Sequence, residues 1–180
     1  MLAVLIATSL PAHALTSHQS GPTFDLGAGL GLRGAPLRPA VGGDVCLGWW
    51  AGTFDDQFSF GRYWHLQAVG RVDWHPDALG LTPMLELRRG LDIIVAGLSW
   101  GVAGGAVLSF PSEGEAPPVG FTGRGSLMGK FRRTRFLAIT ARLEAGADVV
   151  GGTPSFGGGF LLGMSFMRPA HRIEDPDPSR

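Results

Sequence analysis

Hydrophobic and polar residues alternate with a period of two along most of this chain. The pattern is clearest from Trp64 to Trp74, where Trp, Leu, Ala, Gly and Val share one phase and His, Gln, Arg and Asp fall in the other. A strand places such sets on opposite faces, whereas a helix would scatter them around its circumference. The same split recurs in seven further segments between about Thr23 and Phe166. The alternation therefore predicts an all-β chain of about eight antiparallel strands.

Two kinds of connection separate these segments. Arg88–Gly90 and Arg132–Thr134 are expected to be tight turns, and Gly104–Pro118 is expected to be a long loop rich in Pro and Glu. If the N-terminus lies in the periplasm, the tight turns fall on the periplasmic side and the loop lies outside. Outer-membrane barrels prefer this arrangement.

Large aromatic residues indicate which face meets lipid. Trp64 and Trp74 lie ten residues apart in the apolar phase, and two phenylalanine pairs repeat this spacing, Phe121 with Phe131 and Phe156 with Phe166. Ten tilted strand residues rise roughly 25 Å, which is the height of the apolar band on membrane barrels. We therefore expect eight aromatic residues at the membrane interfaces: Trp49, Trp64, Trp74, Trp100, Phe121, Phe131, Phe156 and Phe166.

The opposite phase is expected to line a narrow lumen. It combines glycine, serine and alanine with five basic and five acidic residues, and an eight-stranded barrel is only wide enough inside to be filled by side chains. Because an unpaired buried charge is expensive, this balance predicts a paired network. Its predicted members are Asp44, Arg71, Asp73, Glu86, Arg88, Arg124, Lys130, Arg142, Glu144 and Asp148.

Composition supports a membrane location. Charged residues make up 17% of the chain and Lys130 is its only lysine, so a soluble surface of lysine and glutamate cannot form. The formal net charge is zero, which gives no reason to expect nucleic acid as a partner.

The chain divides into four predicted parts. Residues 1–14 resemble a signal peptide, with an apolar run and the cleavage pattern Ala12-His13-Ala14. Residues 15–22 form an N-terminal segment and 23–167 the barrel. Residues 168–180 are polar and rich in proline, which predicts a disordered tail.

This pattern resembles the small eight-stranded outer-membrane barrels, the class that includes the OmpA-type transmembrane domain. Those proteins commonly end the last strand on an aromatic residue preceded by alternating hydrophobic residues, and Phe160–Phe166 is similar. Fourteen residues follow Phe166, which departs from the strictest form. The resemblance implies a closed, up-and-down transmembrane β-barrel in the bacterial outer membrane, and it carries over no functional residue.

Two other architectures compete with this interpretation. Ile93–Ser112 and Val149–Met167 are uncharged runs long enough for transmembrane helices of an inner-membrane protein, although both contain several glycines. Alternatively, a soluble periplasmic barrel would turn its apolar phase inward around a ligand cavity.

A structural or interaction role is the first functional hypothesis, with outer-membrane lipid around the barrel and a protein partner at loop 104–118 or tail 168–180. A lipid-modifying enzyme is an alternative, with His65, Asp73 and His75 as weak catalytic candidates in one inward phase. The two histidines lie ten residues apart on one strand, too far to share a metal ion. No metal or cofactor is expected, and a solute channel is the third hypothesis because the lumen is expected to be filled.

Overall fold

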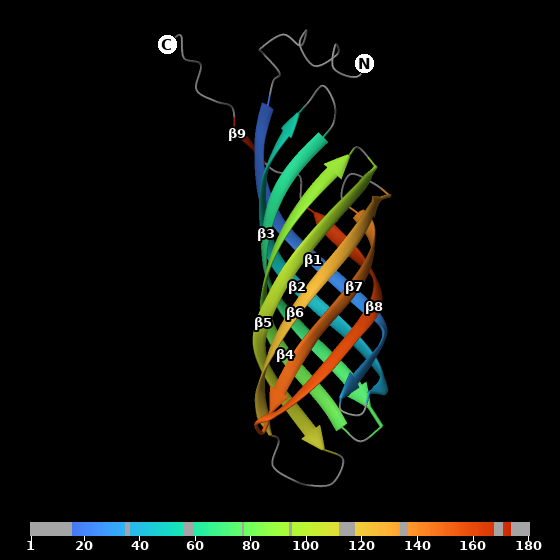
Figure 1. The fold of residues 1–180 in the computed structure, drawn as a ribbon. Helices are drawn as coiled ribbons and strands as arrows, with labels where there is room; N and C mark the ends of the chain where they lie inside the picture. Colours follow the sequence, from blue (N-terminus) through green and yellow to red (C-terminus); the bar gives the residue numbers. More distant parts are fainter. Residues whose placement is uncertain are drawn as a thin grey trace, which may run out of the picture.

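The structure, a computed structural model, describes residues 16–34, 37–55, 60–76, 78–93, 95–111, 118–133, 137–167 and 171–173. The predicted signal peptide, 1–14, lies outside these residues. The described part is all-β and forms a tall barrel (Figure 1). Its strands are β1 (Thr16–Gly34), β2 (Arg38–Asp55), β3 (Phe60–His75), β4 (Ala78–Ile93), β5 (Ala96–Pro111), β6 (Val119–Arg132), β7 (Leu137–Val150), β8 (Thr153–Met167) and the short β9 (His171–Ile173).

The barrel is closed because β1 pairs with strands on both of its sides. Each of β1 to β8 pairs antiparallel with its neighbours in sequence, and β1 also pairs antiparallel with β8 from Thr23–Met167 to Gly34–Phe156. This arrangement confirms the predicted closed, antiparallel up-and-down barrel of eight strands. Closure leaves no open edge around the wall, which is the only way a sheet can satisfy its backbone in lipid.

The strands are staggered around the barrel. Following paired residues once around the wall from Leu30 leads back to Ser20, ten residues away on the same strand. In an eight-stranded barrel, such a stagger goes with a strand tilt of about 40°. Two residues paired across neighbouring strands therefore differ in height along the barrel axis by just over one residue, because ten residues of stagger are shared among eight strands.

Side chains alternate strictly between the outside and the lumen. On β4, Leu85 is 66% exposed outside, whereas Thr82 and Arg88 are completely buried inside. The outward face thus carries the apolar residues and the inward face the polar ones. This facing overturns the soluble barrel with an apolar interior.

The helical alternative is also excluded. Ile93–Ser112 falls mainly in β5, and Val149–Met167 covers the β7–β8 hairpin. Within the described residues, the structure holds no helix of the length and apolarity that a membrane crossing requires.

The predicted turn at Arg88–Gly90 is wrong. These residues lie within β4, and the chain reverses between Ile93 and Ala96. Arg88 is buried in the lumen and Arg89 lies exposed on the outer wall. Two consecutive arginines suggested a solvated turn, but in a strand they occupy opposite faces.

Three predicted segments also differ in extent. Gly104–Pro111 belongs to β5, which shortens the expected loop to residues 112–118, and Pro118 accepts a backbone hydrogen bond from Ser109 at 3.2 Å. β1 begins at Thr16, so the predicted N-terminal segment 15–22 is largely strand paired with β2. Within the predicted tail, β9 pairs with His18–Ser20 of β1. In all three places, backbone pairing with a neighbouring strand continues further along the chain than the alternation of side chains indicated.

Inward-facing glycines make room for the large lumen residues. Tyr63 is buried in the lumen and pairs across the sheet with Gly90. A Cβ atom on Gly90 would collide with the Tyr63 ring. Gly129 faces outward, and a Cβ atom there would lie 4.0 Å from its nearest neighbour, the backbone oxygen of Ala141. Similar pairs join Asp73 with Gly42, Arg124 with Gly146, and Arg33 with Gly157. At each of these four pairs, a glycine gives the large neighbouring side chain its space in the lumen.

We expect Gly90→Ala to lower the free energy of unfolding by about 1–3 kcal/mol, because the added methyl group overpacks the lumen against a buried ring. Gly129→Ala is the matched control and should be neutral or slightly stabilising, since glycine weakens an exposed strand position. Urea titration of the refolded protein measures both. Equal midpoints for the two variants would contradict this packing.

Candidate functional site

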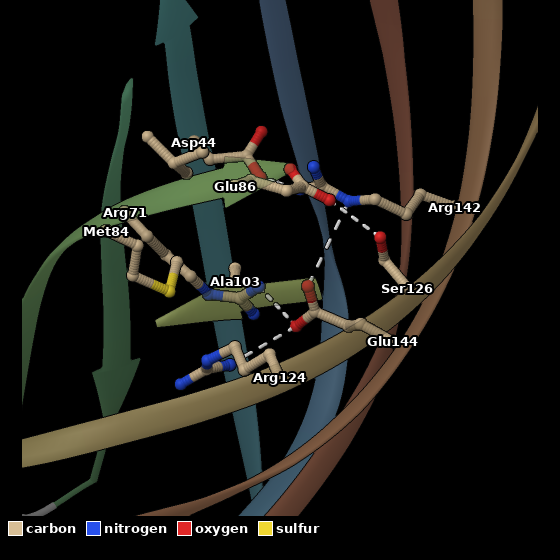
Figure 2. Close-up of a pocket in the computed structure, with 10 residues that line it drawn as sticks. Asp44, Arg71, Met84, Glu86, Ala103, Arg124, Ser126, Arg142 and Glu144 are labelled. Atoms are coloured by element: carbon tan, nitrogen blue, oxygen red, sulfur yellow. Dashed lines mark hydrogen bonds and ion pairs between the residues drawn. The ribbon is translucent and has the colours of Figure 1, made fainter. Parts of the chain in front are cut away.

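The lumen contains a network of charged side chains contributed by facing strands. Glu144 on β7 lies at its centre (Figure 2). It accepts from Arg71 on β3, and it forms ion pairs with Arg124 at 3.4 Å and with Arg142 at 3.9 Å. Arg142 also pairs with Asp44 on β2. These contacts cross the barrel, so they hold opposite parts of the wall together.

A second group of contacts surrounds Glu86 on β4. Arg88 donates to its carboxylate at 2.8 and 2.9 Å, Ser126 donates at 2.7 Å, and Gln67 donates at 2.5 Å. Arg88 also contacts the sulfur of Met128 at 3.2 Å. The Glu86 carboxylate is thus bound by side chains from two other strands, β3 and β6, and by Arg88 of its own strand.

Asp73 and Asp148 extend the network toward the end of the barrel that lies away from β9. Arg71 donates from Nε to both carboxylate oxygens of Asp73 at 2.9 Å, and Arg33 binds the same carboxylate at 2.8 Å. Asp148 pairs with Arg124 at 3.3 Å and with Arg33 at 3.6 Å. Every acidic residue of the predicted network therefore has an arginine partner.

The centre of the lumen is nearly full. The space enclosed by Arg71, Arg124, Arg142 and Glu144 is about 10 Å³, which is about one water molecule. One wall is apolar, where Cys46, Val69 and Met84 pack together. At this level of the barrel, the packed charges leave space for about one water molecule between them.

Further contacts fill the lumen toward the end near β9. Thr23 and His65 are hydrogen bonded at 2.6 Å, and Lys130 lies with Nζ 4.8 Å from the centre of the Tyr63 ring. Lys130, predicted as a member of the charge network, thus meets an aromatic face in the described contacts. Trp50 faces inward, unlike its neighbour Trp49.

The three weak catalytic candidates do not converge. His65 pairs across the sheet with Arg88, whereas His75 pairs with Ala78 at the opposite end of β3. Asp73 is bound by two arginines. His65 is hydrogen bonded to Thr23 and lies at the other end of β3 from Asp73 and His75, so the three residues cannot act together on one substrate atom.

Four charged residues of the lumen were missing from the predicted network: Asp25, Arg33, Asp92 and Arg132. Arg33 binds Asp73 and Asp148, and Asp92 pairs with Arg132 at 2.5 Å. Arg33 shares the polar phase of its strand, so its position already indicated an inward side chain. Asp92 was missed because the turn was placed before it.

The eight predicted interface aromatics all lie on the outer face and are at least 40% exposed. After correction for the stagger, Trp49, Trp64, Phe131 and Phe166 lie at nearly one level, with Trp100 slightly nearer the middle. The remaining three form a second level about ten residues away: Trp74, Phe121 and Phe156. The two levels are thus separated by about 25 Å along the barrel axis.

The lumen opens at the end away from β9. There, a cavity of about 380 Å³ is lined by residues that include Arg33, Arg38, His75, Thr82, Ser109 and Asp148. We call it the vestibule. In the residues that the structure describes, no group of three or more His, Cys, Asp or Glu side chains could hold a metal ion.

Comparison with known proteins gives similarity to solved structures but no match by sequence. Neither a protein-family model nor a curated protein matches the chain. Among solved structures, the chain is similar to Ail, the attachment invasion locus protein of Yersinia pestis, at 12% identity and a TM-score of 0.33. The match covers 82% of this chain and 99% of that chain. The similarity concerns the fold alone, and the OmpA-type resemblance stays a prediction.

We expect Glu144→Gln to lower the free energy of unfolding by about 3 kcal/mol, because it leaves buried arginines without their shared carboxylate. Arg62→Gln, an exposed charge on the outer wall, is the control and should change it by less than about 0.5 kcal/mol. Urea titration in the same detergent compares them. A loss below about 1 kcal/mol for Glu144→Gln would show that the network behaves like an exposed ion pair.

Proposed function

We propose that this chain is an integral β-barrel of a bacterial outer membrane, with a closed lumen and a structural or interaction role. One observation carries the proposal: an apolar outer face lies between two levels of aromatic residues about 25 Å apart, matching the apolar band of membrane barrels. In water, such a face would expose most of its large hydrophobic side chains.

The outer charges and the longest connection support an orientation. Arg89 lies on the outer wall beside Trp64, with its guanidinium carbon 5.3 Å from the ring centre. Arg62 lies on the same face of β3, two residues before Trp64 and nearer to the end that holds β9. Cationic side chains beside tryptophan suit the headgroup region. These cations place this end at a membrane surface. The longest connection between consecutive strands, residues 112–118 between β5 and β6, lies at the vestibule end. Because membrane barrels carry their longer loops outside, we place the vestibule at the outer surface and the end near β9 at the periplasm.

The filled lumen argues against transport. Conduction would require a continuous aqueous path, but the buried ion pairs leave space for about one water at the centre. A structural or interaction role remains, with lipid around the wall. A protein partner would bind at the connection 112–118 or at the tail, where β9 already pairs with β1. No arrangement of His65, Asp73 and His75 favours a lipid-modifying enzyme.

Membrane fractionation tests the proposal. The full-length protein should be recovered in the outer membrane and migrate differently in unheated and boiled gel samples, because folded barrels resist detergent. Purified protein in planar bilayers should give no conductance steps. Recovery in the soluble fraction would overturn the location, and reproducible conductance would overturn the closed lumen.

Depth-dependent substitutions test contact with lipid. Leu143 lies midway between the aromatic levels, and Leu91 lies beyond them beside Arg62. Leu143→Arg should cost about 2–4 kcal/mol of folding free energy in lipid vesicles, and Leu91→Arg about 0–1 kcal/mol, because the penalty falls toward the interface. Equal effects at the two positions would show that lipid does not surround this wall.

A further inference from the structure

The vestibule is a cavity lined by both apolar residues and a few polar side chains. It exists because the inward residues at this level are small, including Gly80, Val107 and Ser155, so that the side chains present do not fill it. Its volume of about 380 Å³ lies at the lower end of the range for small-molecule sites. The charge network closes it on the lumen side. It is therefore a pocket with one opening rather than a passage.

Two buried polar groups of the vestibule lack partners among the described residues. Thr82 is 0% exposed, and its hydroxyl has no hydrogen bond. Arg33 is 8% exposed; Nη1 binds Asp73, but Nη2 has no hydrogen bond. Buried polar groups in proteins nearly always have partners. Both groups can donate, so the partner that fits them is an acceptor.

The unpaired donors of the lining, Nη2 of Arg33 and the hydroxyl group of Thr82, suit an anion. Arg33 and Arg38 are the cations of the lining, with His75 beside them. Asp148 is the lining carboxylate, and it already binds Arg33 and Arg124. Arginine presents several donors to oxyanions and is the preferred cation for phosphate and carboxylate.

We propose that the vestibule binds a small oxyanion, a phosphate group above all, through Arg33, Arg38 and the Thr82 hydroxyl group. The volume leaves room for a group attached to the phosphate, such as a sugar. The free anion and the phosphate of a small metabolite would make the same contacts. The inference requires only the folded barrel, so it can fail while the proposed membrane location holds.

Calorimetry tests the site on the full chain refolded in zwitterionic detergent micelles at low salt. Titration with inorganic phosphate should show saturable binding of one equivalent. Arg38→Gln should weaken it about tenfold or more, as expected for the loss of a charged hydrogen bond. Thr82→Val, which keeps the side-chain shape, should weaken it several-fold. The matched control Arg62→Gln removes one positive charge from the outer wall and should leave binding unchanged.

Glucose 1-phosphate serves as a second probe and should compete with inorganic phosphate for the same site. The gel shift on boiling checks that each variant is folded, and Thr82→Val keeps the test decisive if Arg38→Gln does not fold. Three results would overturn the proposal: no saturable binding of phosphate up to about 10 mM, equal weakening by Arg62→Gln, or failure of the two probes to compete.

Discussion

An eight-stranded barrel encloses a lumen so narrow that side chains must fill it, and this limit shapes the whole structure. The inward face holds charged residues, so each must find an opposite charge within reach across the lumen. Glu144 meets this requirement by binding arginines from three strands. Asp73 binds arginines from β1 and β3, and Glu86 binds Arg88 of its own strand. The ion pairs therefore tie together strands that are far apart around the wall.

Glycine is the counterpart of these large side chains. Where Tyr63, Asp73 or Arg124 turns into the lumen, the paired residue on the next strand is a glycine. At these positions the large side chain has room because the adjacent residue has no side chain. This pairing of large with small explains why a chain with 29 glycines forms long strands, although glycine weakens a strand in isolation.

The two ends of the barrel differ in chemistry. Near β9, the lumen is filled by Tyr63, Trp50 and the Thr23–His65 hydrogen bond, and the outer wall carries Arg62 and Arg89. At the opposite end, inward residues are small, and two arginines with a buried threonine border an open cavity. The middle network separates these ends. The same barrel thus combines a closed wall and a filled centre with a cavity at one end.

The alternation of residues determined the number of strands, the face of each side chain and the aromatic levels, because a strand sends neighbours to opposite faces whatever its partners are. Period-two patterns cannot mark where a strand ends, so Arg88–Gly90 and Gly104–Pro111 were placed in connections although both are strand. The sequence also could not predict which charged side chains form ion pairs inside the lumen. Which carboxylate meets which arginine depends on the stagger of ten residues around the barrel, and only the closed structure sets that stagger. The vestibule, likewise, arises where small residues of separate strands reach one level, which no single segment reveals.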